Sequence, residues 1–236
     1  MSGTHDEALA IYPGRESALG LRSLIRNGWS LVSMFANPLP TMPADLPRGD
    51  GNTVLVIPAF LSGDWATAGL RGFLKHLGYR VETAGVLLNM GPAPKLVARL
   101  DQTLQRLAQN GPIVVIGQSL GGVLARDLAQ RHPQSVRQVI TLCSPIRVPI
   151  TTPLAPAAHL LSVLYDSEWL ARRRAIAGPL GVPVTALYSE DDGVVDWREC
   201  LQDDHPGSSN IRVRGAHATI GSNPVALTAI AHALTS

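Results

Sequence analysis

A short glycine-rich segment near the middle of the chain constrains the fold more than any other feature. The segment GQSLG at residues 117–121 directly follows the apolar run 113–116 and precedes a helix-like stretch at residues 123–131. A strand that turns sharply into a helix holds its central serine in a strained backbone conformation, with the hydroxyl clear of the sheet. The residues two positions away must be small, because strand and helix nearly collide there, and both are glycine. The segment therefore predicts a nucleophile elbow with Ser119 at its tip.

The remainder of the chain favours one α/β domain. It has 236 residues, of which 45% are hydrophobic and 16% charged, enough for a sizeable single core. Short apolar runs at residues 53–57, 139–142 and 183–188 alternate with helix-like stretches such as 66–77 and 94–109. This alternation is typical of a parallel sheet covered by helices on both faces.

With this elbow in this setting, the chain resembles the α/β-hydrolase family, and in particular its small lipase and esterase branch. The resemblance covers residues 52–234. It implies an α/β-hydrolase fold with a mostly parallel central sheet, helices on both faces and a short cap insertion. We expect a helical extension at residues 1–50, packed on a hydrolase domain at 51–236 whose cap spans about residues 146–178.

In that family the catalytic acid follows the nucleophile, and the histidine comes last. Asp192 fits the acid, because it lies in the loop after the buried run 183–188 and precedes Gly193 and a short apolar pair. An acid at the end of a strand near the nucleophile can orient the base. Asp191 is the next candidate, and Glu190 and Asp196 lie close by.

His217 is the expected base. It follows the short strand-like run 210–213 and precedes a closing helix at about residues 224–234, so it falls on a strand-to-helix loop. Catalytic groups gather on such loops at the carboxyl edge of the sheet. His205 lies in a polar loop and His232 in the closing helix, and both are expected at the surface.

Two backbone amides are expected to stabilise the oxyanion of the reaction. One belongs to Leu120, which follows the nucleophile, and the other to Phe60 in the loop after the run 53–57. Many lipases carry His-Gly before this second donor, whereas this chain carries Pro58-Ala59, so the correspondence is one of position only. Leu61 is the alternative donor.

The segment after residue 145 is the predicted cap, and its apolar side chains predict a pocket for an apolar acyl group. Tentative substrate-binding residues are Leu61, Leu160, Leu164 and Trp169. The arginine run 172–174 is expected to form a solvated helix face.

Composition and motifs exclude several other classes. The net charge of +2 is spread along the chain and only two residues are lysines, which gives no basic footprint for nucleic acid. No metal-ligand spacing and no phosphate-binding glycine loop is recognisable, so we expect neither a metal nor a cofactor. Cys143 and Cys200 are expected as free thiols.

The first ten residues lack the pattern of a signal peptide, and no apolar run approaches membrane-spanning length, so a cytoplasmic location is expected. Residues 19–35 have apolar side chains at helical spacing. They predict either a helix packed on the domain or a helix that lies on a membrane surface.

The sequence thus predicts a serine hydrolase that cleaves carboxylic esters through an acyl-enzyme on Ser119, with Asp192 and His217 completing the triad. Amidase, thioesterase and acyltransferase chemistry use the same residues and stay open as alternatives. A hydrolase-fold protein that only binds a ligand or partner is the alternative from another class.

Overall fold

The computed structural model describes residues 10–12 and 45–235. Its centre is a six-stranded sheet of order β3-β2-β4-β5-β7-β8, in which each neighbouring pair is parallel. The strands are β2 (Thr53–Ile57), β3 (Arg80–Thr83), β4 (Ile113–Gln118), β5 (Val136–Leu142), β7 (Val184–Ser189) and β8 (Ser208–Val213). The predicted parallel sheet is confirmed.

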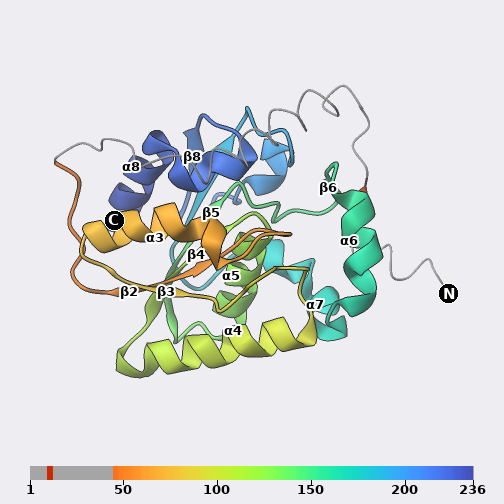
Figure 1. Ribbon diagram of the computed structural model, residues 1–236, viewed down its shortest axis with the longest axis horizontal. Helices are drawn as coiled ribbons and strands as arrows, with labels where there is room; N and C mark the ends of the chain where they lie inside the picture. The colour runs from red at the N-terminus through yellow and green to blue at the C-terminus, as the bar shows by residue number, and fades with distance from the viewer. Residues whose placement is uncertain (1–9, 13–44, 236) are drawn as a thin grey trace.

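Helices cover both faces of this sheet, with α3 and α8 above the strands and α4 below them in Figure 1. Successive residues of β2 point to opposite faces, so Val54 and Val56 join one buried cluster while Leu55 and Ile57 join another. Both faces of the sheet are therefore buried, which explains why the strands have continuous apolar runs. The covering helices are α3 (Ala68–His76), α4 (Pro94–Leu107), α5 (Leu120–Arg131) and α8 (Pro224–Ala233).

The carboxyl ends of the parallel strands bring the predicted site segments to one edge of the sheet. Gln118 at the end of β4 pairs with Leu142 at the end of β5, and Leu142 pairs with Leu187 of β7. Ser189 of β7 in turn pairs with Val213 of β8. The loops that follow these strands therefore start side by side, where ligands bind in open α/β sheets.

The predicted cap region lies between β5 and β7 and contains α6 (Ala155–Leu161) and α7 (Ser167–Arg172), which lie together at one end of the molecule (Figure 1). It also contains β6 (Ile150–Thr151), which pairs in parallel with β1 (Ile11–Tyr12). Of the predicted helical extension at residues 1–50, the structure describes residues 10–12 and 45–50, which contain the strand β1 and no helix. The helix predicted at residues 19–35 lies outside the described residues.

Arg173 corrects one expectation about the cap. The run 172–174 does not form a solvated face, because Arg173 is only 2% exposed. Its two terminal nitrogens donate to the carbonyls of Ile146 and Pro145 at 2.8 and 2.7 Å, which satisfies the guanidinium where water cannot reach it. Burial, with a smaller contribution from Arg126, lowers its pKa to about 10, so it stays charged at neutral pH.

Within the described residues, no helix is both long enough and apolar enough to cross a membrane.

Candidate active site

Ser119 occupies the tight turn between β4 and α5. Its φ of +53° and ψ of −123° form a backbone conformation that residues other than glycine rarely adopt. The two flanking glycines are required by space. A Cβ on Gly117 would lie 2.2 Å from the carbonyl oxygen of Gly121, and a Cβ on Gly121 would lie 2.3 Å from that of Ile57. The predicted strand–elbow–helix geometry is therefore present.

Asp192 and His217 meet in the loops after β7 and β8. Asp192 Oδ2 lies 2.6 Å from His217 Nδ1, and both side chains are nearly inaccessible to solvent. Asp192 Oδ1 accepts hydrogen bonds from the amides of Val194 and Val195 at 2.8 and 3.0 Å. The carboxylate is thus held from one side by its own loop and presents its other oxygen to the imidazole.

Burial alone would raise the pKa of Asp192, but the charge of His217 and the hydrogen bonds to the carboxylate outweigh it, and the pKa is lowered. The other acids of the loop have different roles. Asp191 is exposed, Glu190 forms an ion pair with Arg212 at 2.6 Å, and Asp196 caps a 3-10 turn through the Arg198 amide. Asp192 is therefore the carboxylate that the fold brings to His217.

Gln118 links the elbow to the histidine loop, a role that sequence reasoning did not assign. Its Nε2 donates to the carbonyl oxygen of His217 at 3.0 Å. Because Gln118 directly precedes Ser119, this buried bond fixes the backbone of the histidine relative to the elbow. A second bond, from Ser189 Oγ to the Gly215 carbonyl at 2.7 Å, ties the same loop to β7.

Cys143 follows β5 and packs against the same carboxylate. Its Sγ, an Asp192 oxygen and a His217 ring nitrogen all lie within 4.8 Å of one another. Burial, and next the charge of Asp192, raise the pKa of the thiol well above its ordinary value. A cysteine binds a metal ion as the thiolate, which the raised pKa disfavours, so this trio suits a hydrogen-bonded acid and base better than a metal site.

The two expected oxyanion donors, Phe60 and Leu120, line the same cavity as Ser119. Leu120 is the first residue of α5, where the amide has no partner within the helix. The alternative donor, Leu61, is committed elsewhere, because its amide donates to the Asn89 carbonyl at 2.7 Å. Leu61 also has a positive φ of 56°.

The cavity beside Ser119 has a volume of about 620 Å³ including its open mouth. Trp169 of α7 lines it, as expected, but Leu61, Leu160 and Leu164 do not. Leu160 is 76% exposed, because α6 turns Ala158 inward and places Leu160 on its outer face, while Leu154, just before the helix, also lines the cavity. Apolar side chains dominate the wall, among them Phe60, Val123, Ile150, Leu154, Ala158 and Val195.

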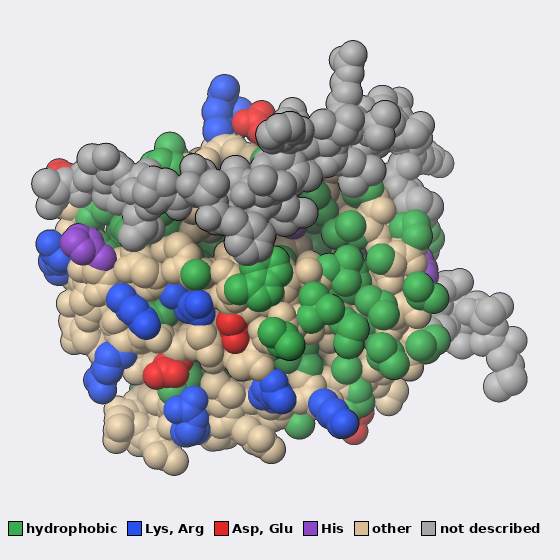
Figure 2. Space-filling model, in the orientation of Figure 1, with side chains coloured by type: hydrophobic (Ala, Val, Ile, Leu, Met, Phe, Trp, Pro, Cys, Tyr) green, Lys and Arg blue, Asp and Glu red, His purple; other side chains and the backbone are tan. Residues whose placement is uncertain are grey.

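Exposed hydrophobic side chains continue outside the cavity. Figure 2 shows them gathered on the part of the surface where α6 lies. The most exposed are Leu87 at 85%, Val163 at 80% and Leu160, which come from the cap and from the loop after β3. The loop that carries Leu87 continues to Pro92, and the cap segment that carries Leu160 and Val163 continues to Tyr165. Pro92 and Tyr165 are two further residues of the cavity wall.

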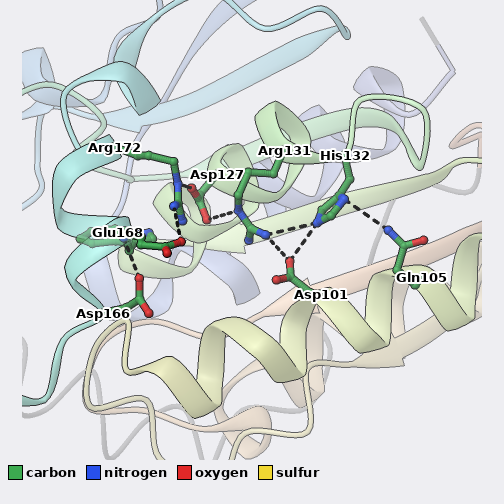
Figure 3. Close-up of polar contacts among 9 residues, drawn as sticks. Asp101, Gln105, Asp127, Arg131, His132, Asp166, Glu168 and Arg172 are labelled. Carbon is green, nitrogen blue, oxygen red and sulfur yellow. Dashed lines mark hydrogen bonds and ion pairs between the residues drawn. The ribbon is translucent and has the colours of Figure 1, made fainter.

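Helix α7, which carries Trp169, is fixed to the core by a polar network (Figure 3). The Asp127 carboxylate of α5 accepts from Arg172 of α7 at 3.1 Å and from Arg131 at 2.9 Å. Arg131 in turn reaches Asp101 of α4. The cavity wall formed by α7 is therefore tied to the same helix that begins at the nucleophile.

Comparisons with known proteins agree with this fold. Residues 91–179 match the family model of the alpha/beta hydrolase fold. No curated protein sequence matches the chain. Among solved structures, a thioesterase domain from the curacin biosynthetic pathway is similar at 17% identity with a TM-score of 0.55, covering 83% of this chain and 93% of its own.

Two further structures are similar at 17% identity, and each covers 83% of this chain. Alpha/beta hydrolase domain-containing protein 10 from mouse has a TM-score of 0.54 with 95% of its own length covered. Aspergillus fumigatus lipase B has a TM-score of 0.62, but only 55% of its length is covered. The chain therefore has the α/β-hydrolase fold.

Proposed function

We propose that this protein is a serine hydrolase that cleaves carboxylic esters with an apolar acyl group. The observation that carries the proposal is the buried hydrogen bond between Asp192 and His217, on loops that start beside the strained Ser119. A carboxylate that orients a histidine near a strained serine that lines a cavity is the arrangement that activates a hydroxyl for acyl transfer.

In the proposed reaction His217 accepts the Ser119 proton at Nε2 while Oγ forms a bond to the ester carbonyl carbon. Asp192 accepts a hydrogen bond from the Nδ1–H group, which selects the required tautomer and stabilises the imidazolium. The bond to the alcohol oxygen then breaks, and His217 returns the proton to the leaving alcohol. Water, activated by the same histidine, hydrolyses the acyl-enzyme to the carboxylic acid and free Ser119.

The amides of Phe60 and Leu120 are the proposed donors to the oxyanion. The carbonyl oxygen becomes negative as Ser119 attacks, and two preorganised N–H groups stabilise it without rearrangement. The commitment of the Leu61 amide to Asn89 favours Phe60 over its neighbour. The apolar cavity wall and the exposed apolar surface near α6 favour substrates whose acyl group is hydrocarbon.

Thioesters and amides pass through the same intermediates, and a thioesterase domain is among the structural neighbours. A panel of matched esters, thioesters and anilides with a common acyl group separates these activities. We expect the ester to give the highest kcat/KM, and a thioester preferred more than tenfold would move the assignment to thioester hydrolysis.

The first test is intact-mass analysis after exposure to a fluorophosphonate, which labels an activated serine. We expect one adduct on the wild type, one on the control Ser209→Ala, and none on Ser119→Ala. Ser209 suits the control because it lies on β8 and its Oγ donates to Thr185 rather than to a site residue. Labelling of Ser119→Ala, or no labelling of any protein, would contradict the proposed nucleophile.

A further inference from the structure

Asn89 lies in the loop between β3 and α4 and is completely buried. Its Nδ2 donates to the carbonyl oxygen of Pro58 at 2.9 Å, and its Oδ1 accepts from the amide of Gly91 at 3.1 Å. Both ends of the side-chain amide are thus satisfied, as a buried amide requires. The partner at one end belongs to the loop that contains Phe60.

The backbone of Asn89 makes two more bonds to the same loop. The amide of Leu61 donates to the carbonyl oxygen of Asn89 at 2.7 Å, and the amide of Asn89 donates to the carbonyl oxygen of Ser62 at 2.7 Å. Together with the bond to Pro58, one residue fixes the 58–62 loop on both sides of Phe60. None of these three bonds uses the Phe60 amide.

The Pro58 carbonyl is also close to the elbow. A Cβ on Gly121 would lie 2.7 Å from this oxygen, so the peptide after Pro58 is in contact with the turn that carries Ser119. Without the Nδ2 donor, the Pro58 oxygen would be a buried acceptor with no partner from Asn89, which costs free energy until the peptide reorients. That reorientation would move the next amides, including that of Phe60.

We propose that Asn89 is a positioning residue of the oxyanion hole: its side-chain amide holds the Pro58 carbonyl and thereby aims the Phe60 N–H at the substrate oxyanion. The proposal rests on the serine hydrolase function proposed above. Oxyanion donors act at 2.7–3.1 Å from the developing charge, so a shift of about 1 Å removes much of their effect. Asn89 itself does not touch the reacting atoms.

The test compares an oxoester with the thionoester that has sulfur in place of the carbonyl oxygen. Sulfur is a weak hydrogen-bond acceptor, so the thionoester depends less on the oxyanion donors. Asn89→Asp keeps the size of the side chain but replaces the donor by an acceptor. We expect kcat for the oxoester to fall about 10- to 100-fold, with KM changed less than threefold and a much smaller fall for the thionoester.

The matched control is Gln138→Ala, which also removes a buried side-chain amide. Gln138 Nε2 donates to the Ala233 carbonyl at 2.7 Å, between β5 and the end of α8. We expect this control to lower the melting temperature while leaving the ratio of oxoester to thionoester rates unchanged. Asn89→Ala serves as the second variant if Asn89→Asp does not fold, because the space it leaves can admit a water molecule.

A proportional fall for both esters, or a change confined to KM, would show a structural role only and overturn the proposal. The same holds if the rate ratio in the Asn89 variants matches that of Gln138→Ala. Failure of the proposed function has a different signature: a Ser119→Ala variant that hydrolyses the oxoester as fast as the wild type. That result would remove the basis of the Asn89 proposal as well.

Discussion

Asp127 is the residue whose loss should most weaken the attachment of α7 to the core. Its carboxylate is 2% exposed and contacts two guanidiniums, whereas Arg131 and Arg172 are 20% and 30% exposed. Breaking a fully buried ion pair costs about 3–5 kcal/mol, and breaking an exposed one costs about 0–1 kcal/mol. Because both arginines reach solvent and Arg131 keeps Asp101, we expect Asp127→Asn to lower the free energy of unfolding by about 2 kcal/mol.

The assay is urea unfolding followed by circular dichroism at pH 7, with Glu168→Gln as the control. Glu168 also faces Arg172, but at 3.7 Å and with its side chain 87% exposed, so its loss should cost at most about 0.5 kcal/mol. For a chain of this size 2 kcal/mol corresponds to a fall of about 4–8 °C in Tm. A loss for Asp127→Asn no larger than that of the control would refute the argument that burial strengthens this network.

Two shorter predictions concern pH and the elbow. Burial raises the pKa of Glu199 to about 7 from 4.5, so the folded state binds its proton more tightly and stability falls as pH rises through this window. Glu199→Gln should therefore raise Tm relative to the wild type at pH 8 but not at pH 5, and an equal gain at both would contradict this sign. Gly121→Ala places a Cβ 2.3 Å from a backbone oxygen and should reduce fluorophosphonate labelling at least about 100-fold, whereas Gly181→Ala, with open space around it, should label normally.

Much of the sheet could be predicted from the sequence, because strands buried on both faces are continuous apolar runs. The run 53–57 coincides with β2, the run 113–116 falls within β4, and the run 183–188 overlaps β7. Strand β3 was not predicted, since it lies at the edge of the sheet and most of its side chains are exposed. The two-residue strands β1 and β6 are too short to have a period.

The site residues on loops with sequence motifs could be named, whereas those that act by tertiary contact could not. Asn89 belongs to no motif, and Gln118 occupies a variable position of the elbow segment, so only the fold shows that they contact the 58–62 loop and His217. Arg173 looked like part of a solvated run. Its spacing of four residues from Trp169 could have indicated that both share the inner face of α7, where both line the cavity.

The pairing of β1 with β6 makes the cavity beside Ser119 a composite of two distant parts of the chain. Ile11 lines the cavity, its carbonyl oxygen lies 2.7 Å from His159 Nε2, and its neighbours bond to Ile150 and Thr152 through their carbonyls. A graft of the cap alone into a related scaffold would leave out one piece of its wall. To transfer the whole wall of this cavity to another protein of the same fold, the segment around residue 11 has to be transferred together with the cap.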